Sequence, residues 1–146
     1  MDREALAKQL KQDEGVRLTA YHDSLGFLSC GVGHLCIPED HMVIGQTITA
    51  AQCHAFLEAD ITTALHACLL LWPAFLAYPE EAQQVLANMA FNLGMTHLRG
   101  FHALIKAVSA RDWYGAAAAG CDSRWAEQVG KRAERLMVRL GAVTET

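Results

Sequence analysis

Two carboxylic acids near the start of the chain have the residue types and the spacing that acid–base chemistry requires. Glu14 lies directly before Gly15, and Asp23 follows in the turn-like stretch Asp-Ser-Leu-Gly. Cleavage of a glycosidic bond needs one carboxyl group that donates a proton to the leaving oxygen and one ionised carboxylate on the sugar's other side. A chain reversal between Glu14 and Asp23 would place them across a cleft, so the sequence is compatible with this chemistry.

The first of these acids belongs to a predicted helix. Leu6 and Leu10 fall on one side of a helix that begins after Asp2, and Gly15 is suited to end it in a left-handed conformation. Glu14 then lies in the last helical turn, where the helix dipole disfavours a carboxylate. Stability alone therefore does not account for Glu14.

The second acid belongs to a predicted β-hairpin over residues 16–34, with strands at residues 16–22 and 27–34 and Asp23 at the bend. Aspartate often opens a turn by hydrogen bonding to its own backbone, so a purely structural role for Asp23 stays open. Gly31 and Gly33 alternate in the second strand and indicate a bulge or a close approach of the backbone to another group.

The rest of the chain is predicted to be helical. A capping box at residues 49–52 opens a long helix that Pro73 ends, and a second helix runs from Pro79 to Gly94. Shorter helices follow at residues 96–110, 112–120, 123–129 and 131–140. The fold class is therefore α+β and mostly helical, with a small β-lobe facing a larger helical lobe across a cleft. We expect a single domain over residues 1–146, with a β-lobe at about 15–48, a helical lobe at about 1–14 and 72–146, and a connecting helix at about 49–71.

Composition and charge exclude several function classes. The net charge is −4 and basic residues are not clustered into a phosphate-binding surface, so we expect no nucleic-acid partner. The longest apolar run is shorter than a bilayer-spanning helix, and the N-terminus lacks a secretion signal, so we expect no membrane anchor.

The five cysteines show no paired spacing, which favours folding in a reducing compartment. No zinc-binding spacing occurs among the cysteines and histidines, so we expect no metal and no cofactor.

Several ordered segments carry a resemblance to a known family. The first is Glu14-Gly15, Tyr21, Asp23, Gly26, Ser29, Gly31, Gly33 and His34, and the later ones are residues 88–94, 100–101 and 123–135. Together they resemble phage-type lysozymes, the endolysins grouped in family 24 of the glycoside hydrolases. This resemblance covers most of the chain and implies a lysozyme-like fold. It also implies a muramidase that cleaves the β-1,4 bond between N-acetylmuramic acid and N-acetylglucosamine in peptidoglycan.

The resemblance also implies catalytic roles. Glu14 matches the family's proton donor, and Asp23 with Ser29 matches the pair that places the attacking water, which implies inversion at the sugar carbon. The family's usual residue at position 29 is threonine, and serine lacks the methyl group that stiffens χ1. Arg132 matches an arginine that pairs with the glutamate, although a solvated helix arginine is the alternative.

Further positions match residues that support the family's site. His34 and Asp60 match a structural ion pair between the hairpin and the long helix. Another group matches positions near the sugar-binding cleft: Tyr21, Leu35, Phe91, Asn92 and Phe101. Core packing is the favoured alternative for Phe91 and Phe101.

The expected setting is the cytoplasm of a bacterial host, with action on the cell wall in the periplasm after the inner membrane opens. The expected partner is peptidoglycan, and a monomer is the default state. Two alternatives stay open. One is a catalytically weak or inactive lysozyme-fold module that binds wall glycan or a protein, which the acidic charge and Ser29 favour. The other is a lytic transglycosylase, which Asp23 and Ser29 disfavour.

Overall fold

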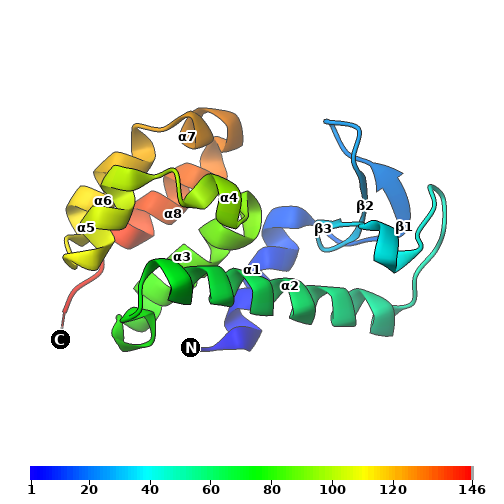
Figure 1. The fold of residues 1–146 in the computed structure, drawn as a ribbon, viewed down its shortest axis with the longest axis horizontal. Coiled ribbons are helices and arrows are strands. Elements are labelled where there is room, and N and C mark those ends of the chain that lie inside the picture. The colour runs from blue at the N-terminus through cyan, green and yellow to red at the C-terminus, as the bar shows by residue number, and fades with distance from the viewer. Residues whose placement is uncertain (146) are drawn as a thin grey trace. The chain divides into compact units, whose positions relative to one another are not determined.

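The computed structural model describes residues 1–145 and divides into two compact units. The sheet unit comprises Arg3–Thr62, and the helical unit comprises Met1–Asp2 together with the chain from Thr63 onward. Over the described residues the elements are eight α-helices, two short 3-10 helices and three strands (Figure 1). The predicted mostly helical α+β class is confirmed.

The sheet unit begins with α1 (Arg3–Glu14), which buries Leu6 and Leu10 as its spacing predicts. Gly15 ends this helix with a φ of 74°, and its N–H donates to the carbonyl of Lys11 at 3.0 Å. A residue with a side chain adopts this left-handed conformation only at a cost, which explains the glycine. Glu14 is therefore fixed as the last residue of the helix.

A small antiparallel sheet follows, in the order β1 (Arg17–His22), β2 (Leu28–Gly31) and β3 (His34–Leu35). The predicted hairpin is confirmed as β1 and β2, but the prediction of one strand through residue 34 is wrong. Gly31 and Gly33 adopt φ values of 62° and 59°, and the chain reverses there to form β3. The alternating glycines therefore mark a second turn.

The remaining elements of the sheet unit are η1 (Pro38–Asp40) and the first part of α2 (Ala50–Leu71). The predicted capping box is confirmed. The Thr49 N–H donates to Oε1 of Gln52 at 2.8 Å, and the Gln52 N–H donates to Oγ1 of Thr49 at 3.1 Å. These bonds satisfy two donors that the first helical turn would otherwise leave unpaired.

The helical unit contains the end of α2 and the following helices: η2 (Phe75–Ala77), α3 (Glu80–Leu93), α4 (Met95–Leu98), α5 (His102–Ser109), α6 (Trp113–Cys121), α7 (Arg124–Val129) and α8 (Lys131–Gly141). The predicted single helix over residues 96–110 is wrong, because Gly100 and Phe101 separate α4 from α5. Asp112 and Ser123 cap α6 and α7 through their side chains. Both caps agree with the predicted starts of these helices.

The large hydrophobic core lies in the helical unit. Its fully buried side chains include Trp72 and Phe75 of the segment after α2, Leu86 and Met89 of α3, and Leu136 of α8. Burial of each such side chain contributes about 1.5–3 kcal/mol relative to exposure.

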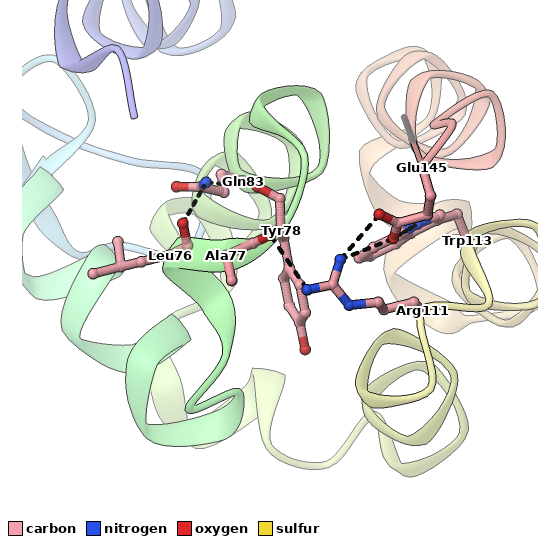
Figure 2. A network of polar contacts seen from close by, with 7 residues as sticks. All are labelled: Leu76, Ala77, Tyr78, Gln83, Arg111, Trp113 and Glu145. Carbon is pink, nitrogen blue, oxygen red and sulfur yellow. Dashed lines mark hydrogen bonds and ion pairs between the residues drawn. The ribbon is translucent and has the colours of Figure 1, made fainter.

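Polar contacts tie the last described residue to this unit (Figure 2). The Arg111 guanidinium donates to both carboxylate oxygens of Glu145 at 3.0 and 3.1 Å and to the carbonyl of Ala77 at 3.3 Å. The indole N–H of Trp113 donates to Oε1 of Glu145 at 2.9 Å. One carboxylate thus serves two donors from the α5–α6 region.

The lobe boundaries proposed from the sequence stay a prediction. The sequence assigned residues 1–14 to the helical lobe, whereas α1 groups with the strands in the sheet unit. Within residues 1–145, no helix combines the length and the apolar character needed to cross a bilayer.

Candidate active site

The carboxyl group of Glu14 packs against the backbone of Gly33. A Cβ atom built on Gly33 would lie 2.6 Å from Oε2 of Glu14, so any residue with a side chain at this position would displace the Glu14 carboxyl. Gly33 also has a positive φ of 59°, a second reason for glycine at this position. The turn between β2 and β3 therefore accommodates the half-buried carboxyl at the end of α1.

Asp23 organises the turn between β1 and β2. Its N–H donates to the carbonyl of Phe27 at 2.8 Å, and its Oδ1 accepts from the N–H groups of Leu25 and Phe27, each at 2.9 Å. Asp23 therefore does have the structural role that a turn aspartate predicts. Both side-chain bonds use Oδ1, and Oδ2 accepts no hydrogen bond from residues 1–145. That oxygen is free to accept from a water or a substrate.

Three of the predicted site residues form one row across the sheet. Ser29 in β2 lies opposite Tyr21 in β1 and opposite Leu35 in β3. Directly opposed residues of an antiparallel sheet project from the same face. Ser29 is 5% exposed, while Leu35 is 52% exposed. The guanidinium of Arg17 lies 3.7 Å from the centre of the Tyr21 ring and restrains it through a cation–π contact.

His34 lies between two carboxylates. Its Nδ1 is 2.7 Å from Oδ2 of Asp60, its Nε2 is 2.9 Å from Oδ2 of Asp40, and its ring stacks on Phe56 with centroids 4.1 Å apart. Burial alone lowers the pKa of His34, but the hydrogen bonds and charges of Asp60 and Asp40 outweigh it and raise this pKa above its ordinary value. Only the protonated ring donates to both carboxylates at once. These contacts join β3 to α2 and η1.

Asp40 is a residue of this cluster that the sequence did not reveal. Burial raises its pKa, but the N–H of Ile37 and the protonated ring of His34 reverse that effect, and the net pKa of Asp40 is lowered. The Pro-Glu-Asp stretch predicted only a loop. Nothing in its spacing pointed to His34.

The helical unit holds the other predicted site residues. Nε and Nη2 of Arg132 donate to Oδ1 of Asn88 at 3.1 and 2.8 Å, and Asn88 is fully buried. Asn88 lies in one of the segments that carry the family resemblance, but the sequence predicted no role for it. An amide on the buried side of α3 was the available signal, because buried polar groups need partners. The pairing of Arg132 with Glu14 stays a prediction.

Asn92 and Phe101 both contact Trp125. The indole N–H donates to Oδ1 of Asn92 at 2.7 Å, and the Phe101 ring meets the indole edge-on at 6.5 Å between centroids. Phe101 also lines a pocket of about 510 Å³ with Leu93, His97, Ala119 and Trp125 among its walls. Phe91 packs, partly buried, against the core.

The described geometry has the features of a carbohydrate-cleaving site built on carboxylates. A helix-terminal glutamate lies against a glycine turn, and an aspartate with a free oxygen occupies a neighbouring hairpin. Two carboxylates on neighbouring elements are the groups that glycoside hydrolysis of the two-carboxylate type requires.

Comparison with known proteins identifies the family. The sequence matches the family described as Phage lysozyme over residues 11–142, and the chain therefore belongs to the phage lysozyme family. The family has lysozyme activity in general, which is glycoside hydrolysis of peptidoglycan.

Individual relatives agree with this membership. The chain is 31% identical over 123 residues to an endolysin of Acyrthosiphon pisum secondary endosymbiont phage 1, covering 84% of this chain and 80% of that protein. It is 25% identical over 155 residues to probable T4-type lysozyme 2 of Dictyostelium discoideum, covering 91% of each. It is 29% identical over 153 residues to the pre-baseplate central spike protein Gp5 of Enterobacteria phage T4, covering 90% of this chain but only 27% of that protein.

Proposed function

We propose that this protein is a muramidase that hydrolyses the β-1,4 bond between N-acetylmuramic acid and N-acetylglucosamine in bacterial peptidoglycan. The observation that carries the proposal is the placement of Glu14 against the Gly33 turn in the same unit as Asp23 and Ser29. Membership in the phage lysozyme family supports the substrate. Endolysin relatives support a role in cell lysis, with action on the wall after the inner membrane opens.

The mechanism assigns one task to each carboxylate. Glu14 donates its proton to the glycosidic oxygen as the bond to the leaving sugar breaks. Asp23 accepts a proton from a water molecule through Oδ2, the oxygen that the turn does not use. Ser29 orients this water through its hydroxyl. Attack from the face opposite the leaving group inverts the configuration of the sugar carbon.

Arg132 and the residues that match the family's sugar-binding positions also have roles in the proposed mechanism. Asn88 fixes the guanidinium of Arg132, which we assign to orienting Glu14. Tyr21 and Leu35, in one row with Ser29, would contact the sugar next to the water. We assign glycan contacts also to Asn92, Phe91 and Phe101 of the helical unit.

The test measures reducing ends released from purified peptidoglycan by the parent and by Glu14→Gln, with mass spectrometry of the soluble fragments. Glu4→Gln is the matched control, because Glu4 is exposed on the same helix. We expect the parent and Glu4→Gln to release fragments with ordinary reducing muramic-acid ends and Glu14→Gln to release at least about 100-fold less.

Other outcomes would replace the proposal. Glu14→Gln activity within about tenfold of the parent would remove Glu14 as the acid. A 1,6-anhydro end on the products would identify a lytic transglycosylase instead. Binding to the wall without any release would identify a binding module. The anomer formed first, read by NMR, tests inversion separately.

A further inference from the structure

Two free cysteines of the sheet unit lie within reach of each other. The Sγ atoms of Cys30 and Cys36 are 3.5 Å apart, and the Cys36 thiol donates a hydrogen bond to Cys30. Cys30 belongs to β2 and lies opposite His34, and Cys36 follows β3 two residues beyond His34. Because alternate residues of a strand share a face, both thiols lie on the face opposite Ser29.

The backbone around the two thiols is fixed by the sheet. The N–H of Cys36 donates to the carbonyl of Leu28 at 2.9 Å, which continues the β2–β3 ladder beyond Leu35. Cys30 and Cys36 are diagonal neighbours across this antiparallel pair, and their side chains turn towards each other to bring the sulfurs to 3.5 Å. A disulfide bond requires a sulfur–sulfur distance of about 2.05 Å, so the two sulfurs need to approach by only about 1.5 Å.

We propose that Cys30 and Cys36 form a disulfide bond when the folded protein meets a thiol–disulfide oxidant. The bond would join β2 to the segment after β3. The oxidant is a low-molecular-weight disulfide such as oxidised glutathione.

The environments of the two thiols set the order of events. Cys30 is fully buried, whereas Cys36 is partly exposed. Burial, with a further contribution from the Cys36 hydrogen bond, raises the pKa of Cys30 to about 12, so its thiol stays protonated and unreactive towards solvent. Within this pair, Cys36 is therefore the thiol that meets the oxidant first.

The exchange is balanced in two steps. The Cys36 thiolate attacks one sulfur of the oxidant, forms a mixed disulfide and releases one small thiolate. The released small thiolate takes the proton of Cys30, whose sulfur then attacks Sγ of Cys36. This attack releases the second small thiolate, which takes up the proton that Cys36 lost to solvent. Two protein thiols lose two electrons in total, and the small disulfide gains them and becomes two thiols.

The other three cysteines are the alternative partners for a disulfide bond. Cys53 is buried near Gly31, where a Cβ built on Gly31 would lie 3.3 Å from its Sγ. Cys68 is buried in the core of the helical unit, and Cys121 is exposed there. Only Cys36 combines partial exposure with hydrogen-bond contact to a second thiol among residues 1–145.

The bond would restrain the turn that carries Gly33, which contacts Glu14. The condition under which the bond would form in the cell rests on the proposed function, because that function takes the protein from a reducing cytoplasm to an oxidising periplasm. The bond itself does not depend on that function, and its test needs no activity measurement.

The experiment incubates the folded protein with oxidised glutathione and measures its mass. Apart from any glutathione adduct on the exposed Cys121, we expect a loss of about 2 Da that dithiothreitol reverses. We also expect a higher melting temperature for the oxidised form, since the cross-link restricts the unfolded chain. Pepsin digestion locates the bond, because pepsin can cleave at Leu35 between the two cysteines. Trypsin cannot, since residues 18–98 contain no lysine or arginine.

Two variants sharpen the result. Cys36→Ser should abolish the mass loss, and Cys53→Ser, which removes another cysteine of the same unit, should retain it. A mapped link between other cysteines, a stable glutathione adduct on Cys36, or no reaction of the folded parent would each overturn the proposal. Mapping the parent protein decides the question even if a variant fails to fold.

Discussion

The sheet unit and the helical unit treat apolar and polar side chains in opposite ways. The helical unit buries its aromatic and aliphatic residues in one continuous core. The sheet unit also buries Leu6, Leu10, Leu57 and Ile61, but it holds eight of the thirteen exposed large apolar residues of the described chain. Leu25 and Phe27, next to Asp23, are 79% and 55% exposed.

Polar groups differ in the same sense. In the helical unit, buried amides serve the fold or hold another side chain, as Asn88 holds Arg132. In the sheet unit, Asp23 keeps one carboxylate oxygen unused by the described protein, and Glu14 is placed at the unfavourable end of a helix. The sheet unit therefore holds carboxylates in arrangements that stability alone does not favour, as the proposed function requires, whereas the helical unit contains the large core.

The strongest way to break this comparison is Asp23→Asn. Asparagine keeps the Oδ1 acceptor for the N–H groups of Leu25 and Phe27, so the turn should persist. We expect hydrolysis to fall about 10²–10⁴-fold while the free energy of unfolding changes by less than about 0.5 kcal/mol. Reducing-end release and urea denaturation measure the two effects, with Glu39→Gln as an exposed control. Full activity would mean that another group activates the water.

A pair of leucine substitutions tests the other side of the comparison. Leu86→Ala removes a fully buried side chain of the helical core and should cost about 2–5 kcal/mol of unfolding free energy. Leu25→Ala, at an exposed position of the sheet unit, should cost less than about 0.5 kcal/mol. Urea denaturation of both variants checks the difference. Equal losses would show that the exposed leucine packs against something in solution.

The sequence predicted those features that depend on neighbouring residues. The Thr49–Gln52 box, the Asp112 and Ser123 caps and the Gly15 helix end all form within one helical turn. A short stretch of sequence therefore suffices to predict such caps.

Features that depend on tertiary packing were mostly missed, although the resemblance did imply the pairing of His34 with Asp60. No spacing encodes the contact of Asn88 with Arg132, and the contact of His34 with Asp40 depends on η1, which the sequence did not predict. The turn at Gly33 was signalled only by a glycine, whose partner Glu14 lies on another element. The family resemblance pointed to the catalytic candidates, and chemistry alone would have left Asp23 as a turn residue.

The His34 cluster is a polar exception in the sheet unit, because we expect it to contribute stability. The raised pKa of His34 means that its contribution is complete below the ordinary value of 6.5 and is lost as the pH rises through the raised value. The lowered pKa of Asp40 means that its contribution is present above 3.8 and is lost as the pH falls through the lowered value. The cluster therefore contributes most between these two pH limits.

Asp40→Asn isolates this contribution. We expect it to cost about 1 kcal/mol of unfolding free energy at about pH 5.5 and clearly less at a pH above the raised pKa of His34, where the ring is neutral in the parent as well. Urea denaturation of parent and variant at both pH values measures the change. A cost that does not vary with pH would mean that the hydrogen bond to Ile37, and not the charge on His34, accounts for the role of Asp40.

The smallest effect is expected for Glu145→Gln, which tests whether a polar network in the helical unit matters as its core does (Figure 2). Glutamine keeps an oxygen that can accept from the indole of Trp113 but removes the charge that attracts Arg111. The side chains of Arg111 and Glu145 are 38% and 45% exposed, and solvent screens such a pair strongly, so the cost should be below about 1 kcal/mol. Urea denaturation at low and high salt measures this cost, because added salt should remove most of the difference in unfolding free energy between parent and variant. The exposed Glu134→Gln is the control. A larger and salt-independent loss would mean that the Arg111–Glu145 pair is shielded from solvent, and the helical unit would then depend on this polar contact as well as on its core.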